Sequence, residues 1–224
     1  MQYGVVADIH GNLPAFEAVS DAMPAVDRWL CAGDVVGYNP WPAECVTRVR
    51  ELDAPTVMGN HDRAVASETG FRFNSMAAAG VTYAREELDD DAIAWLDGLP
   101  DRRAIADGEI LIVHGHPENP DRYTYPEEFS PAMLDGDARV TISGHTHVQG
   151  VREFDEGIVM NPGSVGQPRD GNPDAAFAVL DIDEETGAID VETHRVGYDI
   201  DRVIEAVGDA GLPEKIGSRL REGR

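Results

Sequence analysis

The sequence predicts an α/β fold in which two mixed β-sheets stack on each other and are flanked by helices. Three strand–loop–helix units follow one another within the first 66 residues, a pattern typical of parallel strands. After residue 150, short apolar runs alternate with tight turns, which is typical of antiparallel pairing. The 224 residues contain no internal repeat, low-complexity tract or linker, so we expect one domain that spans residues 1–224.

The first part of the chain is expected to alternate strands and helices. Apolar runs predict strands over Gln2–Ala7, Val26–Ala32 and Ala54–Met58. Apolar side chains at helical spacing predict helices over Asn12–Ala22 and Pro42–Leu52. The inward faces of these helices are expected to carry Leu13, Phe16, Val19 and Ala22, then Val46 and Val49.

The middle of the chain is expected to contain two helices, a hairpin and a third helix. The first two helices lie within Asn74–Leu99. Asp107-Gly108 predicts the turn of a hairpin whose strands are Arg103–Ala106 and Glu109–Val113. A helix around Glu127–Leu134 and a strand over Arg139–Ser143 are expected to follow.

The last part of the chain is expected to form antiparallel strands and then helical turns. The predicted strands are Val151–Phe154, Gly157–Asn161, Ala175–Asp183 and Ala188–Val196. Helical turns near Ile200–Val207 are expected after them.

The charge of the chain is strongly negative. It carries 42 acidic and 18 basic residues, a formal net charge of −24, and the acids are spread along its whole length. Such a surface repels itself unless salt screens it, and it resembles halophilic proteins from organisms with molar intracellular salt. The same charge argues against nucleic acid or an anionic membrane as partner.

The lack of a recognisable targeting signal and the two isolated cysteines favour a cytoplasmic protein. The negative charge suggests that this cytosol has a high salt concentration. No segment approaches eighteen consecutive apolar residues, and the N-terminus has no basic region. Cys31 and Cys45 lack metal-type spacing, and we expect them to be reduced, buried thiols.

Five turns at the ends of predicted strands share one chemical character. They are Asp8-Ile9-His10, Gly33-Asp34-Val35-Val36-Gly37, Gly59-Asn60-His61-Asp62, His114-Gly115-His116 and Gly144-His145-Thr146-His147. Six of the seven histidines fall in these turns. Open α/β sheets bind ligands at the carboxyl ends of their strands, so the five turns together predict a metal site.

Each turn also has a simpler explanation when taken alone. Asp8 could cap the following helix, and Asp34 between glycines could be a turn residue. His114 could be a hydrogen-bonded residue at the end of a strand. His145 and His147 would point the same way in a strand, which does not by itself require a metal.

The Gly59-Asn60-His61-Asp62 turn suggests a hydrolytic centre. Asn60 offers a neutral amide oxygen to a metal, and His61 can give or take a proton near neutral pH. Asp62 could fix the tautomer of the His61 imidazole and make it more basic.

These blocks, in this order, resemble the calcineurin-like metallophosphoesterase superfamily. Asn161-Pro162-Gly163-Ser164 is similar to a further block of its compact single-domain bacterial and archaeal branch. The matching blocks span residues 8–164. The resemblance implies a four-layer αββα sandwich and an enzyme, a metal-dependent phosphoesterase.

The resemblance further implies a two-metal centre. The first ion would be held by Asp8, His10, Asp34 and His147. The second ion would be held by Asp34, Asn60, His114 and His145, with Asp34 as the bridge. Nitrogen and oxygen ligands without thiolate suit Mn²⁺ first, with Fe, Zn²⁺ or Ni²⁺ as alternatives.

The mechanism expected for such a centre is in-line attack on phosphorus by a metal-bridging hydroxide. His61 would protonate the leaving oxygen and Asp62 would orient His61. The expected partner is a small phosphorylated substrate: a phosphodiester, a phosphomonoester, a phosphoprotein or a dinucleoside polyphosphate. A catalytically silent scaffold of the same fold is the alternative from another class.

Three further residues are candidates for substrate contact. Asn12 and Arg169 could reach a phosphate oxygen, although Asn12 could equally cap a helix and Arg169 could be a surface charge. His116 is expected to face the substrate or support a ligand. The sequence leaves open whether the protein forms a homo-oligomer.

Overall fold

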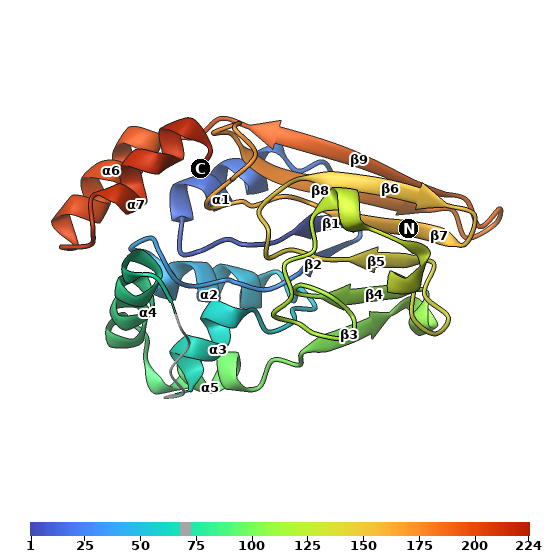
Figure 1. The fold of residues 1–224 in the computed structure, drawn as a ribbon, viewed down its shortest axis with the longest axis horizontal. Helices are drawn as coiled ribbons and strands as arrows, with labels where there is room; N and C mark the ends of the chain where they lie inside the picture. The colour runs from blue at the N-terminus through green and yellow to red at the C-terminus, as the bar shows by residue number, and fades with distance from the viewer. Residues whose placement is uncertain (68–72) are drawn as a thin grey trace.

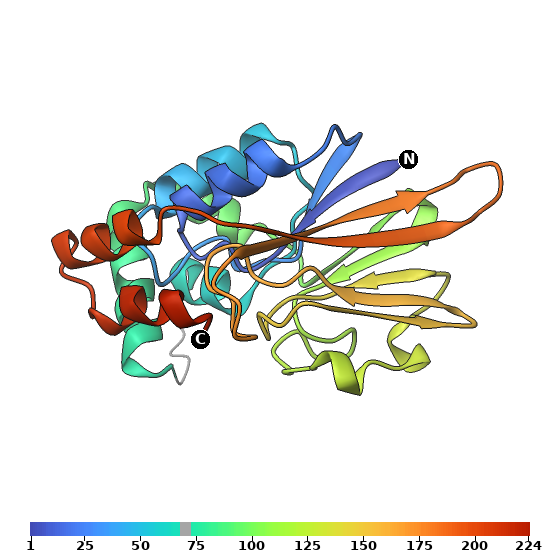
Figure 2. The ribbon, with the colours of Figure 1, turned by 90° about the horizontal axis from the view of Figure 1, so that it is seen from above.

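Two mixed β-sheets lie face to face in the computed structural model, which describes residues 1–67 and 73–224 (Figures 1 and 2). Within these residues one sheet has four strands in the order β2-β1-β8-β9, and the other has five in the order β3-β4-β5-β7-β6. Helices flank the pair. The predicted fold class is therefore confirmed.

The four-stranded sheet joins the two ends of the chain. Its strands are β1 (Gln2–Val6), β2 (Arg28–Cys31), β8 (Ala175–Ile182) and β9 (Ile189–Val196). β1 is parallel to β2 and antiparallel to β8, which in turn pairs antiparallel with β9. The sheet is mixed because the late β8–β9 hairpin pairs with the first strand.

The five-stranded sheet has a parallel centre and antiparallel edges. Its strands are β3 (Arg102–Ile105), β4 (Ile110–Val113), β5 (Val140–Ile142), β6 (Gly150–Phe154) and β7 (Gly157–Asn161). β4 and β7 are parallel to β5, whereas β3 and β6 pair antiparallel with β4 and β7. The hairpin predicted at Asp107-Gly108 is confirmed, whereas the purely antiparallel pairing predicted for β7 is wrong.

The strand predicted over Ala54–Met58 is also wrong. Only one parallel bridge, between Cys31 and Thr56, forms in this stretch. The backbone N–H of Met58 donates to the Pro100 carbonyl over 2.8 Å, so the chain has already left the sheet edge. The segment still places Gly59 close to the carboxyl ends of the strands.

Helices cover the outer face of the four-stranded sheet. They are α1 (Leu13–Ala22) and α2 (Pro42–Glu51). The short α3 (Asn60–Ala66) follows and contacts α4 (Ser75–Glu87) and α5 (Asp90–Asp97), which also contact α2. Phe16, Val19, Val46 and Val49 are buried as predicted, but Ala22 is exposed at the last turn of α1. The third strand–loop–helix unit predicted within the first 66 residues had no helix bounds, and α3 is its helix.

The outer face of the five-stranded sheet carries 3₁₀ turns where a longer helix was predicted. Residues 127–134 form η2 (Pro126–Glu128) and η3 (Pro131–Met133). A helix through this stretch would place Pro131 in its interior, where proline has no N–H to donate and its ring clashes with the preceding turn. Phe129 and Met133 pack with Val159 and so still cover the sheet.

The core between the sheets is made by inward side chains of both. It includes Val5 and Leu30 from one sheet and Ile112 and Ile142 from the other, all fully buried. This packing fixes the sheets so that the carboxyl ends of β1, β2, β4 and β5 meet at one edge. Cys31 and Cys45 are free and buried, as predicted.

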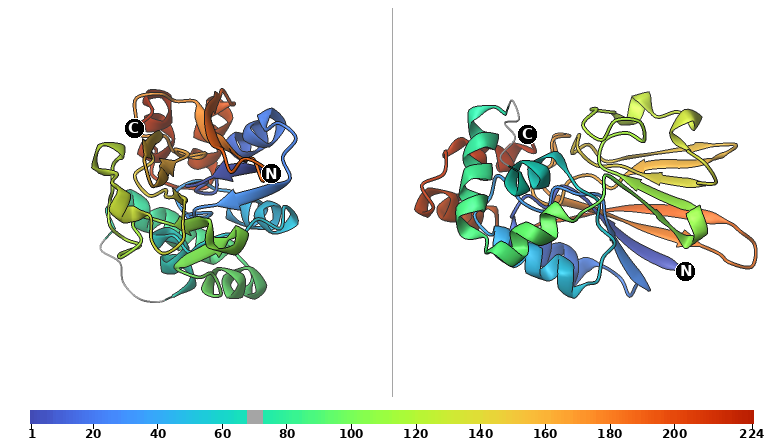
Figure 3. Two further views of the ribbon diagram at one scale, coloured as in Figure 1. Left: turned by 90° about the vertical axis from the view of Figure 1, so that its right-hand side faces the viewer. Right: turned by 90° about the horizontal axis from the view of Figure 1, so that it is seen from below.

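The C-terminal segment packs beside α4 (Figures 1 and 3). It consists of α6 (Ile200–Asp209), α7 (Lys215–Ser218) and η4 (Arg219–Glu222), of which only α6 was predicted. Val207, Ile216 and Leu220 share a buried cluster with Tyr38 and Ala77, close to the strand ends. No helix in the described ranges is long and apolar enough to cross a membrane.

Candidate metal centre

The structure brings the seven predicted ligands together at the carboxyl ends of the strands. Two groups within the described residues have ligand atoms within 4.8 Å of one another. They are Asp8, His10, Asp34 and His147, and Asp34, His114 and His145. Asn60 belongs beside the second group, because its Oδ1 lies 3.2 Å from His114 Nε2. All of these side chains are buried.

Five of these residues have left-handed backbone conformations. Asp8, His10, Asp34, His145 and His147 have φ angles of 52°, 50°, 54°, 68° and 59°. Such conformations cost roughly 1–3 kcal/mol each for residues other than glycine and persist where the surrounding structure enforces them. His145 and His147 thus lie in a turn after the strand, as predicted, and they point inward because the loop bends sharply.

Backbone carbonyls set the tautomers of the histidine rings. The Nδ1–H groups of His10, His114 and His147 donate to the carbonyls of Val36, Ala32 and Gln167 over 3.1, 2.8 and 2.6 Å. In His145 the Nε2–H donates to the Asp121 carbonyl over 3.2 Å. When these rings are neutral, the second nitrogen of each ring carries no proton, and its lone pair points to the centre.

Lone pairs face each other in the first group. Nε2 of His10 lies 3.0 Å from Nε2 of His147, and neither carries a proton in these tautomers. Burial lowers the pKa of both rings well below their usual range, so both are neutral at pH 7. Two nitrogen ligands about 2.1 Å from one ion lie about 3 Å apart at a right angle, so the residues fit a divalent cation.

The second group is also rich in acceptors. His114 Nε2 lies 3.3 Å from Asp34 Oδ2 and 3.1 Å from Nδ1 of His145. Burial opposes charge on His114, yet Asp34 raises its pKa to about 10, so without a metal this nitrogen holds a proton. Burial lowers the pKa of His145 to about 3. A bound cation would take the place of the His114 proton.

Two buried carboxylates supply the negative charge of the centre. Burial raises the pKa of Asp8 to about 7, and its oxygens accept from the His145 backbone N–H over 3.0 and 3.2 Å. Asp34 stands between the groups, 3.6 Å from His10 Nε2 and 3.3 Å from His114 Nε2. Buried carboxylates are retained where a cation or a hydrogen-bonded partner balances them.

Asp62 does not orient His61, contrary to the sequence prediction. Its Oδ2 accepts from the backbone N–H groups of Asp34 and Gly59 over 2.8 and 3.0 Å, and Oδ1 from that of Val36 over 3.2 Å. The carboxylate thus ties the Asp34 turn to the start of α3. Nδ1 of His61 has no hydrogen-bond partner in the described part of the chain.

His61 lies against the centre and lines a cavity of about 200 Å³. Its ring packs against Tyr38 and Phe73, each with centroids 4.7 Å away, and edge-on against His10 at 4.8 Å. Nδ1 is buried beside Gly37, so Nε2 is the nitrogen that can reach a substrate. Burial lowers the pKa of His61 to about 4, so the free ring is neutral at pH 7.

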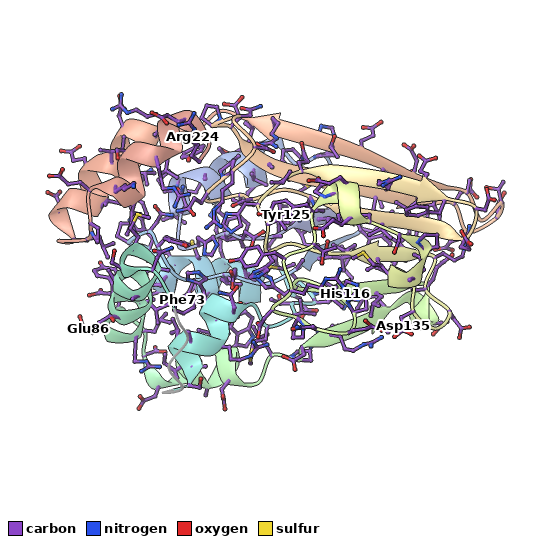
Figure 4. All side chains as sticks on the ribbon, viewed as in Figure 1. Phe73, Glu86, His116, Tyr125, Asp135 and Arg224 are labelled. Atoms are coloured by element: carbon purple, nitrogen blue, oxygen red, sulfur yellow. The ribbon has the colours of Figure 1, made fainter. Side chains whose placement is uncertain are left out.

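The three residues predicted to contact substrate have different positions. Asn12 caps α1, with Oδ1 accepting from the Ala15 N–H over 3.2 Å and Nδ2 donating to the Gly166 carbonyl over 2.9 Å. His116 lies in the loop after β4, where Nδ1 accepts from the Glu118 N–H (Figure 4). Of the three, only Arg169 lines the cavity.

Several cavity residues were missed by the sequence analysis. They are Tyr38, Phe73, Asn74, Ala77, Tyr123 and Arg219. Tyr38 follows the Gly33–Gly37 turn directly, and Tyr123 lies in the loop after β4, with its ring 3.9 Å from that of His145. Their positions next to predicted motifs were usable signals. Arg219 had no such signal, because it lies far along the chain from every motif.

The fold and the two ligand groups define a metallophosphoesterase. The chain belongs to the calcineurin-like phosphoesterase superfamily, because residues 1–185 match the model of the calcineurin-like phosphoesterase superfamily domain. Its class is therefore that of a metal-dependent phosphoesterase.

Three similar proteins illustrate the family. A crystal structure of a metallophosphoesterase from Sphaerobacter thermophilus is 34% identical, covers 100% of this chain and 99% of its own, and superposes with a TM-score of 0.84. An uncharacterised protein of Methanocaldococcus jannaschii is 31% identical over 98% of this chain and 97% of its own length. Phosphodiesterase YfcE of Escherichia coli is 28% identical over 82% of this chain and 89% of its own.

Gly59 is expected to be essential for the position of Asp34. A Cβ atom at residue 59 would lie 2.0 Å from Asp34 Oδ1. Gly59 has a φ of −85°, which alanine adopts freely, so any effect of Gly59→Ala comes from the added methyl group. We expect this variant to bind Mn²⁺ about 10–100-fold more weakly, measured by isothermal titration calorimetry.

Gly208→Ala is the matched control. Residue 208 is exposed on α6, and a Cβ there meets no heavy atom within 4 Å outside its own helix and chain neighbours. This variant should bind Mn²⁺ as the wild type does. Equal Mn²⁺ affinity of Gly59→Ala and the wild type would show that the Asp34 turn tolerates the methyl group.

Asp62→Asn is expected to weaken the centre without changing the position of the His61 ring. The amide places an NH₂ group opposite a backbone N–H, which removes at least one hydrogen bond to Asp34, Gly59 or Val36. We expect the free energy of unfolding to fall by about 1–3 kcal/mol in urea titrations, and Mn²⁺ affinity to fall with it. A changed dependence of rate on leaving group, with stability unchanged, would restore the orienting role.

Proposed function

We propose that the protein is a two-metal phosphoesterase that hydrolyses phosphate esters. His10, His147 and Asp8 would hold one divalent cation, His114, His145 and Asn60 the other, and Asp34 would bridge them. The observation that carries this proposal is the 3.0 Å approach of two unprotonated imidazole nitrogens, which a cation would stabilise. Mn²⁺ is the first candidate, because it suits mixed nitrogen and oxygen ligands.

The charge of the centre suits a phosphate. Two divalent cations contribute +4 and the carboxylates of Asp8 and Asp34 contribute −2, so the filled centre carries about +2 by this count. When bound, such a pair of ions activates water as the nucleophile and offsets the charge of the phosphate. In a chain of net charge −24, this local positive charge would attract a small phosphorylated substrate.

His61 is the proposed proton donor to the leaving oxygen. It lines the cavity beside Asp34 and Asn60. Its Nδ1 is packed against Gly37, so Nε2 is the nitrogen left to face a substrate. The ring is neutral in the free protein, and an anionic phosphate beside it would raise its pKa toward the protonated form. Tyr38 and Phe73 hold the ring from its sides, so it can act without the predicted contact to Asp62.

Phosphodiesters and phosphomonoesters are the proposed substrates. The relative YfcE is named as a phosphodiesterase, which supports the diester. Dinucleoside polyphosphates and phosphoproteins are the alternatives. A silent scaffold of this fold is disfavoured, because the seven predicted ligands gather in one cluster and four of them (Asp34, Asn60, His145 and His147) line the same cavity as His61.

The His61→Ala variant tests the proposal. With Mn²⁺ present, we expect the wild type to hydrolyse aryl and alkyl phosphate esters, and His61→Ala to lose about 10²–10⁴-fold in kcat for alkyl esters. The loss should be much smaller for p-nitrophenyl esters, because that leaving group needs no proton.

Elemental analysis of the same preparations controls for metal loss. A His61→Ala variant that keeps its metals and cleaves alkyl esters at the wild-type rate would exclude the donor role. Wild-type protein that binds no divalent metal would overturn the function.

We also propose that the protein works at high salt, in a cytosol with molar potassium, and binds no nucleic acid. The support is the net charge of −24 with acids spread along the chain. At low ionic strength these charges repel one another and destabilise the compact state.

Stability should therefore rise with KCl. We expect the melting temperature, followed by circular dichroism, to increase steadily between 0.05 M and about 2 M KCl as the charges are screened. Equal melting temperatures across this range would contradict the high-salt proposal.

A further inference from the structure

Two arginine side chains line the cavity beside the metal centre. Arg169 and Arg219 share its wall with Asp34, His61 and His147. The backbone N–H of Arg169 donates to the His147 carbonyl over 3.1 Å, so this arginine is tied to a ligand loop. Because its guanidinium lines the same cavity as His61 and His147, it is placed to contact a ligand that binds at the centre.

Neutral groups hold Arg169 in place. Its Nη2 donates to the Tyr38 hydroxyl over 3.2 Å and to Gln167 Oε1 over 2.7 Å. The guanidinium carbon lies 5.8 Å from the centroid of the Tyr38 ring. These partners orient the guanidinium and leave its positive charge uncompensated.

Arg219 comes from η4, outside residues 1–185 that match the family domain. The segment is anchored by Ile216 and Leu220, both fully buried in the cluster with Tyr38. The backbone N–H of Gly171 donates to the Gly223 carbonyl over 3.1 Å, which joins the end of the chain to the Arg169 loop (Figure 4, at Arg224). The C-terminal segment thus delivers a charge to the cavity.

Neither guanidinium pairs with an Asp or Glu side chain among residues 1–67 and 73–224, although the chain has 42 acids. Nε of Arg219 donates to the terminal oxygen of Arg224, which leaves its two Nη groups for a ligand, and Arg169 has no carboxylate partner in the same ranges. By contrast, Arg221 in the same segment pairs with Asp201 over 2.7 Å. Burial and the neighbouring charge of Arg169 lower the pKa of Arg219. Two partly buried like charges on one wall are unfavourable until an anion lies between them.

We propose that Arg169 and Arg219 form an anion subsite for a second phosphate group of the substrate, next to the phosphate at the metal centre. This inference rests on the proposed function and moves its substrate class from phosphate esters to phosphoanhydrides, the class of the dinucleoside polyphosphates given there as an alternative. Preferred substrates are then condensed phosphates, such as nucleoside diphosphates and dinucleoside polyphosphates. Guanidinium groups suit this task because their planar donors match phosphate oxygens.

The subsite would act on the leaving group. A water molecule adds through its oxygen to the phosphorus at the centre and releases a proton to the solvent, and the bond between that phosphorus and the bridging oxygen breaks. The electron pair stays on the bridging oxygen, so the second phosphate leaves as an anion. The two arginines offset the charge that develops on it.

Arg219→Gln tests the subsite through substrate preference. We expect its kcat/KM for ADP to fall about 10–100-fold, the size of one charge-assisted hydrogen bond. For p-nitrophenyl phosphate, which has one phosphate, it should change less than about threefold. Arg219→Lys should retain part of the ADP activity, and Arg221→Gln, which removes a charge outside the cavity, should match the wild type.

The pattern of losses decides between two roles. If Arg219→Gln loses kcat/KM equally for ADP and for p-nitrophenyl phosphate, Arg219 contacts the reacting phosphate. If its kcat/KM for ADP is unchanged, Arg219 does not contact the substrate. Either result overturns the subsite. Melting temperatures of the variants, measured together, identify any loss that is due to unfolding.

A binding measurement separates the subsite from the proposed function. Calorimetry of imidodiphosphate with metal-free protein in chelator, at one KCl concentration, reports on the arginines alone. Wild-type protein should bind imidodiphosphate more tightly than inorganic phosphate, and Arg219→Gln should lose this preference. No preference in the wild type contradicts the subsite, whereas preference without hydrolysis of any phosphate contradicts only the enzymatic function.

Discussion

The structure depends on one unfavourable juxtaposition: neutral imidazole nitrogens and buried carboxylates held a few ångström apart. His10 and His147 bring two lone pairs within 3.0 Å, and Asp8 and Asp34 lie among them with no Arg or Lys side chain as ion-pair partner in the described residues; without a metal, the protonated His114 is the one cation beside Asp34. Each ring is fixed from behind by a backbone carbonyl, so it cannot turn away. Five of the ligand residues also have strained, left-handed backbone conformations. Strain of this kind is typical of sites in which the protein holds the ligands in place before the cation binds.

Two features of the fold stabilise the protein enough to hold these ligand groups close together. The packed core between the sheets holds the carboxyl ends of strands from both sheets at one edge, and the turns after them reach the same point. Asp62 then joins the Asp34 turn to α3 by accepting three backbone N–H bonds. Charge is segregated as well: apart from the buried Asp8, Asp34 and Asp62, the described acids are exposed or partly exposed, while Arg169 and Arg219 line the cavity. The pocket is therefore suited to anions although the chain as a whole repels them.

Much of this could be predicted from the sequence, because the signals were local. Strands, most helices and the ligand turns follow from short apolar runs ending in glycine, histidine and aspartate. The role of Asp62 could not be predicted, since its partners are backbone groups that only the folded chain brings near. Asn12 had two equal readings, and only the structure shows the helix cap. The position of Arg219 in the cavity could not be predicted, because it depends on how the C-terminal helices pack on α4. Local pattern thus predicts well which residues gather at the centre, and it predicts long-range contacts poorly.

The most direct test of the central claim is anomalous diffraction from crystals of the wild-type protein grown with Mn²⁺. Two manganese peaks should appear, one bound by His10 and His147 and the other by His114 and His145, with Asp34 touching both. A fully occupied crystal with one peak would contradict the bridging role of Asp34. Density with no manganese at either group, under conditions that saturate the protein in solution, would contradict the metal centre itself.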